Sequence, residues 1–324
     1  MRPRYLPFSF VRRFRQVCLR CLVGGLCLFS LPSEAWNTTG HREVIAVAWS
    51  NLSPAIQQRV SDLLARQRVI PNTRDLTGEP AWMAAALWPD ELRDQSDSSE
   101  NLAPPANTRQ WIERARSGQS TRRWHFADRN VALPFQQQPV HGLLEQTLDE
   151  QLRLLANPAQ PAEVRAVALA WVSHLIADAH QPLHSASRAD PLRPGQLDAG
   201  GNTVIVVDAG RRPPDPLSLH RWWDELPGHA RPGSSRFDSE VNRLTHQAAQ
   251  ISGSDISTQP RLWIEESFVI ARDQVYPGLI PNDEVPGSFI IRQDYWLEGR
   301  DITRARLALA ARRLAQVVTQ ALRE

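Results

Sequence analysis

One stretch constrains this chain more than any other: an apolar helical run that ends among histidines. The run covers Val167–Ile176 and leads through His174-Leu175-Ile176-Ala177-Asp178-Ala179-His180-Gln181-Pro182-Leu183-His184. His174 and Asp178 are four residues apart, so their side chains stand on one helix face. Pro182 ends the helix, because its ring clashes with the preceding turn and it has no N–H. His184 can then be aimed back toward that face, and two imidazoles with a carboxylate are ligands that zinc prefers.

The first 35 residues have the pattern of an export signal. Five arginines precede an apolar run over Val17–Leu31, and Ser33-Glu34-Ala35 places small residues where a signal peptidase cleaves. The apolar run is shorter than the ~20 residues that span a bilayer, so a stable membrane anchor is disfavoured. We therefore expect a cleaved signal peptide at residues 1–35, and a secreted or periplasmic mature chain at residues 36–324.

Composition limits which partners the mature chain can attract. All three cysteines lie within the leader, so metal binding after cleavage must rest on nitrogen and oxygen ligands. The formal charge of the full chain is +2, and removing six arginines and one glutamate leaves −3. Bulk charge therefore does not attract a polyanion, and affinity for phosphate must come from a local site.

Apolar residues repeat at helical spacing over most of the mature chain. Ser53-Pro54 predicts a helix start, with serine as N-cap and proline in the first turn. Further helices are expected over Ala81–Arg93, Leu143–Leu155, Ala162–Ala179, around His220, and over Ser239–Ile251, Gln259–Val275 and from Asp301 to the C-terminus. Only Asp198–Asp208 predicts a strand, as half of a short β-hairpin. The sequence predicts a single, mainly α-helical (all-α) domain.

Other parts of the chain carry further candidate ligands, each weak on its own. These are Trp36, His41, Asp90, His125, and the pair His220 and Asp224. An aspartate that follows a proline can simply cap a turn, and an i, i+4 His/Asp pair can be a surface contact. Asp90 and Arg93 could likewise form an ordinary ion pair at a helix end.

Taken in order, these positions resemble the metal ligands of the S1/P1 nuclease family, secreted zinc-dependent endonucleases and 3′-nucleotidases specific for single strands. The similarity runs the whole mature length. It includes Asp178-x-His180-Gln181-Pro182-Leu183-His184, Gly200-Gly201-Asn202 and the segment from Trp263 to Tyr276. The resemblance implies the helical fold that this family shares with zinc-dependent phospholipase C, although the disulfides of some members are absent here.

The resemblance also implies three zinc ions and assigns ligands to each. The first would bind Asp90, His125, His174 and Asp178; the second His184, His220 and Asp224; the third Trp36, His41 and Asp178. Asp178 would thus bridge two ions. The expected reaction is attack on phosphorus by a metal-activated hydroxide that Asp90 orients, while Arg93 neutralises charge on the phosphate oxygens. His180 is expected to hold a ligand through its ring N–H.

The implied substrates are single-stranded DNA, RNA and 3′-nucleotides, with 5′-phosphate products and no obligate protein partner. Phe126 would stack on a base that is not already stacked in a duplex, and Asp128 would accept a hydrogen bond from the base edge. Ordinary core packing remains the alternative interpretation of Phe126.

Two other functions remain open at this stage. Zinc-dependent phospholipases C resemble the pattern, but they carry glutamate where Asp224 stands and lack the run His125-Phe126-x-Asp128. A non-catalytic zinc-binding or adhesion protein would have closed tetrahedral sites. Arg93 and Phe126 argue against that second alternative, because neither would be needed to hold a structural ion.

Overall fold

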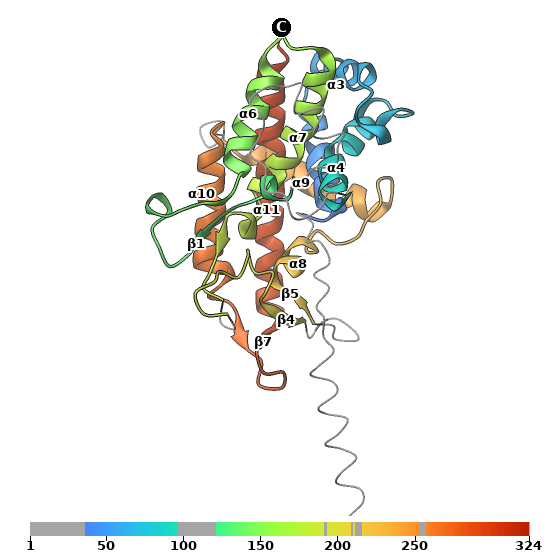
Figure 1. The fold of residues 1–324 in the computed structure, drawn as a ribbon. Coiled ribbons are helices and arrows are strands. Elements are labelled where there is room, and N and C mark those ends of the chain that lie inside the picture. Colours follow the sequence, from blue (N-terminus) through green and yellow to red (C-terminus); the bar gives the residue numbers. More distant parts are fainter. Residues whose placement is uncertain are drawn as a thin grey trace, which may run out of the picture. The chain divides into compact units, whose positions relative to one another are not determined.

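The structure, a computed structural model, describes residues 36–95, 121–190, 193–208, 210, 216–252 and 257–323 (Figure 1). The predicted signal peptide lies outside these residues. In the described part of the chain, the helices are α2 Thr38–Ser50, α3 Pro54–Arg66, α4 Gly78–Gln95, α6 Leu144–Ala156, α7 Ala162–Ala179, α8 Leu219–Asp224, α9 Ser235–Gln250, α10 Pro260–Ile270 and α11 Gln293–Ala321. Helix is therefore the dominant structure, as the apolar spacing predicts.

Helix α7 forms the centre of the core. Every residue from Ala166 to Ala179 is buried. A helix that is apolar on all sides must be covered on all sides, and α7 packs against α3, α4, α6 and α11. Figure 1 shows α6, α7 and α11 running side by side. The ligand-bearing end of α7 is thus held by several neighbouring helices.

Short polar residues start several helices by capping their free N–H groups. The Asn37 side chain accepts hydrogen bonds from the backbone N–H groups of Thr39 and Gly40 at the start of α2. Ser53 caps α3 with Pro54 following, which confirms that predicted start. Ser218 caps α8 in the same way. The caps of α2 and α8 lie at the beginnings of helices that carry His41 and His220, so local sequence helps to orient both.

Among the described residues, two small sheets lie beside the helices, where the sequence predicts a single hairpin. The strands are β1 Ala127–Asn130, β2 His141–Gly142, β3 Ala186–Ser187, β4 Ile205–Asp208, β5 Leu217–Ser218, β6 Ile280–Pro281 and β7 Ser288–Ile291. The sheet orders are β2-β1-β3 and β5-β4-β7-β6. Strand β4 pairs antiparallel with β5 and also parallel with β7, a pairing between distant segments that local sequence does not reveal.

The predicted start of the C-terminal helix is wrong. Helix α11 begins at Gln293, two turns before Asp301, and Ser234 starts α9 a turn earlier than predicted. The early part of α11 lacks a simple apolar stripe, but Tyr295 and Gly299 are buried there. Tyr295 donates a hydrogen bond to the carbonyl oxygen of Val275 and accepts one from Trp223. Tertiary contacts therefore extend this helix beyond what its own periodicity predicts.

Candidate metal centre

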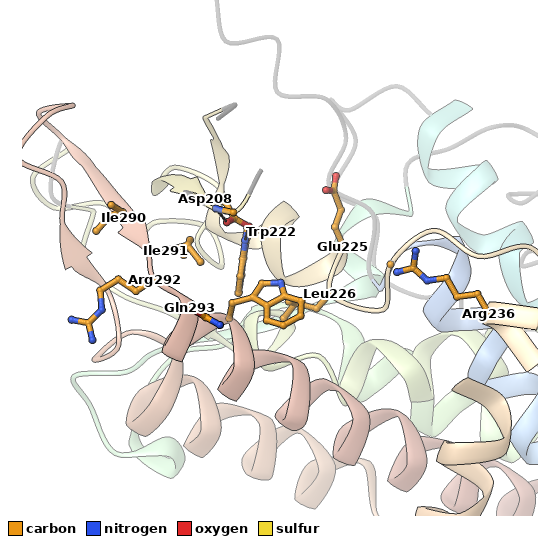
Figure 2. Close-up of a pocket in the computed structure, with 12 residues that line it drawn as sticks. Asp208, Trp222, Glu225, Leu226, Arg236, Ile290, Ile291, Arg292 and Gln293 are labelled. Carbon is orange, nitrogen blue, oxygen red and sulfur yellow. Dashed lines mark hydrogen bonds between the residues drawn. The ribbon is translucent and has the colours of Figure 1, made fainter. Parts of the chain in front are cut away.

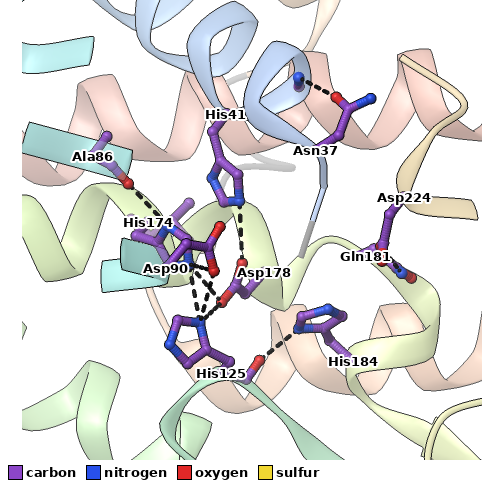
Figure 3. Close-up of polar contacts among 12 residues, drawn as sticks. Asn37, His41, Ala86, Asp90, His125, His174, Asp178, Gln181, His184 and Asp224 are labelled. Carbon is purple, nitrogen blue, oxygen red and sulfur yellow. Dashed lines mark hydrogen bonds and ion pairs between the residues drawn. The ribbon is translucent and has the colours of Figure 1, made fainter. Parts of the chain in front are cut away.

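The first ligand group gathers around the C-terminal half of α7. Asp178 Oδ2 lies 3.0 Å from His125 Nδ1 and 3.3 Å from His174 Nε2. Asp90 Oδ1 lies 3.5 Å from His174 Nε2, and His174 Nε2 lies 3.0 Å from His125 Nδ1. Figure 3 shows these side chains converging from α4, α7 and the 3₁₀ turn η2 (Arg122–His125). The helix spacing places His174 and Asp178 together, and packing brings in the other two.

His41 approaches Asp178 from its other side. Its Nε2 lies 3.6 Å from Asp178 Oδ1, and its ring stacks on that of His174 with centroids 4.2 Å apart. The two oxygens of Asp178 therefore face different imidazoles, which is the geometry a bridging carboxylate needs. Trp36 is fully buried, and the next residue, Asn37, donates its backbone N–H to the carbonyl oxygen of Asp224. The start of the described chain is thereby anchored next to the second ligand group.

The second ligand group joins the turn after α7 to helix α8. His220 Nε2 lies 3.1 Å from His184 Nε2 and 3.5 Å from Asp224 Oδ2. The other carboxylate oxygen of Asp224 accepts a hydrogen bond from the Gln181 side chain at 2.7 Å. All three groups, His41/His174/Asp178, Asp90/His125/His174 and His184/His220/Asp224, are buried sets of donor atoms close enough to hold metal ions.

Backbone carbonyls fix the orientation of three of these imidazoles. The Nδ1–H of His174 donates to the carbonyl oxygen of Ala86 at 2.9 Å. The Nδ1–H of His184 donates to that of His125 at 2.6 Å, and the Nδ1–H of His220 to that of Gly200 at 2.7 Å. In the neutral form of each ring, Nε2 then has a lone pair facing the ligand group. A hydrogen bond from the second nitrogen is the usual way in which proteins orient metal-binding histidines.

Burial keeps most of these imidazoles neutral, which is the form that binds metal. It lowers the pKa of His41 and His220 to about 3 and that of His125 to about 4. The pKa of His184 is also lowered, chiefly by burial. These histidines are therefore ready to donate lone pairs at neutral pH.

The carboxylates make the first group strongly attractive to positive charge. Burial alone would raise the pKa of both Asp90 and Asp178. Arg93 and His174 outweigh it and hold the pKa of Asp90 below the usual range. His174 does the same for the pKa of Asp178. Burial lowers the pKa of His174, yet Asp178 and Asp90 outweigh it and raise this pKa to about 10. Asp178 Oδ1 and both His41 nitrogens also lack hydrogen-bond partners within the described residues. Buried acceptors and lone pairs arranged in this way fit metal cations.

The remaining predicted site residues lie next to the first group. Arg93 Nη1 contacts Asp90 Oδ1 at 2.8 Å, one turn later on α4. Phe126 follows His125 and is half-buried. Asp128 is buried, and its Oδ2 accepts a hydrogen bond from the Ser187 hydroxyl at 2.9 Å, so the carboxyl faces the β1–β3 junction.

Three residues of the site could not be assigned roles from the sequence. The Gln181 side chain donates to the Asp224 carboxylate, and the Gly200 carbonyl accepts from His220. Ser187 links Asp128 to the backbone N–H of Gly200 at 2.7 Å. His180 differs from expectation: its Nδ1 donates to Ile176 and its Nε2 accepts from Arg313, so neither nitrogen holds a ligand. The Gln181-Pro182 and Gly200-Gly201 motifs mark these places but do not reveal their partners.

A separate cavity of about 750 Å³ lies beyond α8 (Figure 2). Trp222, Leu226 and Trp296 form its apolar part, and Glu225, Arg236 and Arg292 contribute charge. Glu225 follows Asp224 directly, but none of the predicted ligands lines this cavity. It adjoins the metal centre without being part of it.

A family profile described as S1/P1 Nuclease matches residues 36–323. The chain belongs to the S1/P1 nuclease family. No match was found among curated proteins. Membership makes this S1/P1 nuclease a hydrolase of nucleic acids, and its three His/Asp groups are consistent with a metal-dependent nuclease. In the part of the chain that the structure describes, no helix has both the length and the apolar character to cross a bilayer.

Proposed function

We propose that this S1/P1 nuclease hydrolyses phosphodiester bonds in single-stranded DNA and RNA, and 3′-nucleotides, with three zinc ions. The observation that carries the proposal is the double use of Asp178, whose oxygens face His125 and His174 on one side and His41 on the other. A carboxylate in that position offsets the charge of two neighbouring cations. Nitrogen and oxygen donors without thiols suit zinc.

The ligand assignment follows the resemblance residue by residue. The proposed sites are Asp90, His125, His174 and Asp178; His184, His220 and Asp224; and Trp36, His41 and Asp178. Zinc bound there would lower the pKa of coordinated water and stabilise charge on phosphate oxygens. The Trp36 amine can take part only if the chain is cut after Ala35. We therefore propose one domain at residues 36–324, exported to the cell exterior or periplasm after loss of residues 1–35.

Two residues beside the first group act on the reacting phosphate in this proposal. The Asp90 carboxylate accepts a hydrogen bond from the attacking water and orients it. Arg93, held 2.8 Å from Asp90, offers further N–H groups to the non-bridging oxygens of the phosphate. Because both side chains are buried, their interactions with charge are stronger than at an open surface.

Selectivity for unpaired strands would come from Phe126. Its half-buried ring follows the ligand His125 directly, so a base stacked on it would lie next to the reacting phosphate. The ring of Phe126 can lie where it does because residue 142 is a glycine: a Cβ at Gly142 would lie only 2.7 Å from Phe126 Cδ2. Only an unpaired base can leave its own stack for such a platform. Asp128, two residues on, is the proposed contact for the base edge.

The test compares substrates on the purified, zinc-loaded mature protein. We expect rapid cleavage of single-stranded DNA and RNA to 5′-phosphates, slow cleavage of duplex DNA, and little hydrolysis of phosphatidylcholine. His220→Ala should abolish activity, while His246→Ala, a histidine on α9 away from the ligand groups, should not. Faster hydrolysis of phosphatidylcholine than of nucleic acid would favour the phospholipase alternative. Full metal occupancy without hydrolysis of any substrate would favour a binding protein.

A further inference from the structure

The turn that follows α7 connects the two halves of the metal centre. Residues 179–183 are the only chain between Asp178 of the first group and His184 of the second. Any movement of this turn therefore changes the distance between the two groups. Gln181 ties the same turn to Asp224 through its side chain. Accurate spacing of the metals requires that this turn be rigid.

Helix α7 and the turn itself offer no hydrogen-bond donor to two carbonyls of the turn. The last carbonyls of a helix have no intrahelical donor. The donors that a continuing helix would use are engaged elsewhere: Leu183 N–H donates to the Gln181 side chain, and His184 N–H to the Gln181 carbonyl. The carbonyls of Ala179 and His180 must therefore be satisfied from outside α7, or remain buried without hydrogen bonds.

Helices α10 and α11 supply these donors. Ser267 Oγ donates to the carbonyl of Ala179 at 2.6 Å, and Arg306 Nε to that of His180 at 3.2 Å. Arg313 Nη1 donates to His180 Nε2 at 2.8 Å. Both arginines are buried, and their positive charge lies at the C-terminal end of α7, where the helix dipole favours it.

Glu266 holds the two arginines in place. Its Oε2 accepts from Arg306 at 2.9 Å and from Arg313 at 2.7 Å, and its Oε1 accepts from Arg313 at 2.6 Å. Arg306 also donates to Ser267 Oγ at 2.8 Å. The donors are therefore fixed relative to one another before they contact the turn. None of these four side chains belongs to the proposed ligands or to the substrate contacts.

We infer that Ser267, Arg306 and Arg313 are positioning residues that set the spacing between the two metal-ligand groups by clamping the turn after α7. The inference rests on the proposed metal centre. Residues that orient ligands indirectly commonly affect metal affinity by 10–100-fold. Loss of the clamp should therefore weaken zinc at His184, His220 and Asp224 by about tenfold or more, and should leave zinc at the first group nearly unchanged.

The experiment is a zinc titration of the mature protein against a chromophoric chelator. The binding step of the second group is identified as the one removed by Asp224→Ala. Arg313→Met and Ser267→Ala should each weaken that step selectively, and Arg313→Lys should restore much of it because it keeps a charged donor. Arg304→Met is the matched control: Arg304 lies on the same helix and pairs with Glu240 at 2.5 Å, away from the turn.

The outcomes separate the clamp from the metal centre. Arg313→Met and Ser267→Ala variants that bind zinc at both groups as the parent does would overturn the clamp alone. Equal weakening of every zinc step, matched by Arg304→Met, would also overturn it, because the effect would then be general destabilisation. A parent protein with no zinc step sensitive to Asp224→Ala would overturn the second metal group, and the clamp with it.

Discussion

Among single residues, Asp178 is the one whose two carboxylate oxygens face different imidazoles of the candidate metal centre. Its neighbours His125, His174 and His41 come from three separate segments of the chain. Changes at this residue should therefore affect more than one metal at once, whereas changes at Phe126 or Asp128 should affect substrate or stability without removing metal.

We expect Asp178→Asn to lower zinc content and turnover together, since an amide bridges two cations poorly. Elemental analysis after gel filtration, with a nuclease assay on the same sample, measures both. Asp62→Asn, an exposed aspartate on α3, is the control and should keep both values. Normal zinc content and turnover in the Asp178 variant would contradict the bridging role.

Phe126→Ala should weaken binding of single-stranded DNA by about 1–3 kcal/mol, the usual contribution of one stacked base. Hydrolysis of a small phosphodiester without a nucleobase should change far less, because the metals are untouched. Phe289→Ala, a half-buried ring on β7, serves as the control for losing an aromatic residue. An equal loss on both substrates would show that Phe126 is a packing residue.

The buried carboxyl group of Asp128 should make the stability of the folded protein depend on pH. Burial raises its pKa well above the usual value, and Asp198 adds to this, although the Ser187 hydrogen bond opposes it. The folded state then holds a proton that the unfolded state releases, so this contribution is fully present below the unfolded pKa and is lost as pH rises through the folded pKa. The amide that Asp128→Asn introduces does not ionise, so this variant lacks that pH-dependent contribution.

The melting temperature of Asp128→Asn, relative to the parent, should therefore rise as pH increases from about 4 toward neutral. Differential scanning fluorimetry of both proteins across this range measures the difference, and the metal-dependent part is common to both. A difference that stays constant with pH would show that Asp128 is ionised in the folded protein. Base preference, measured on homopolymers, then tests its contact with substrate separately.

Among the elements, the turn η4 (Pro182–His184) that follows α7 and the turn around Gly200 shape the second group. Gly200 has φ +64°, and its carbonyl orients His220. A Cβ at this position would lie 2.4 Å from the Leu183 carbonyl oxygen and 3.1 Å from His220 Nδ1. This glycine is thus required both by its backbone conformation and by the closeness of η4 and α8.

Gly200→Ala should weaken zinc at the second group by about 10–100-fold, because the clash displaces His220. Gly195→Ala is a matched control: Gly195 also has positive φ, at +81°, but a Cβ added there would meet nothing within 4 Å. That control should lose about 1–2 kcal/mol of stability from backbone strain and keep its zinc affinity. Equal zinc affinity in the two variants would argue that the turn can relax around the added methyl group.

At the scale of the whole molecule, Trp36, the first described residue and the proposed start of the mature chain, lies beside the second ligand group. Trp36 is fully buried, and Asn37 is bonded to Asp224 and Gly228. An α-amino group has an ordinary pKa near roughly 8 and can bind metal only when free and deprotonated. A residue placed before Trp36 would remove this proposed ligand.

A protein with one extra residue before Trp36 should bind one zinc fewer than the trimmed form and be nearly inactive. Metal analysis and a nuclease assay on the two forms, with N-terminal sequencing of the exported protein, test this. A tag after Glu324, at the opposite end of the chain, is the control and should leave metal and activity intact. Three zinc ions and full activity in the extended form would remove the N-terminus from the site.

Local patterns in the sequence determined most of the helices and two i, i+4 His/Asp pairs, and the order of the full ligand set followed from the resemblance to the S1/P1 nuclease family. The spacing of His174 and Asp178, and of His220 and Asp224, places each pair on one helix face, because an α-helix repeats every 3.6 residues. Ser53-Pro54 marks a helix start for an equally local reason. Such features need only neighbouring residues, so they can be interpreted without a structure.

Only the tertiary structure decided which distant groups meet and what holds them. The approach of Asp90 and His125 to α7, the Gly200 carbonyl on His220, and the contact of Arg313 with His180 all join segments far apart in sequence. The pairing of β4 with β7 and the early start of α11 have the same origin. These contacts depend on how complete helices pack, and helical periodicity carries no information about that packing.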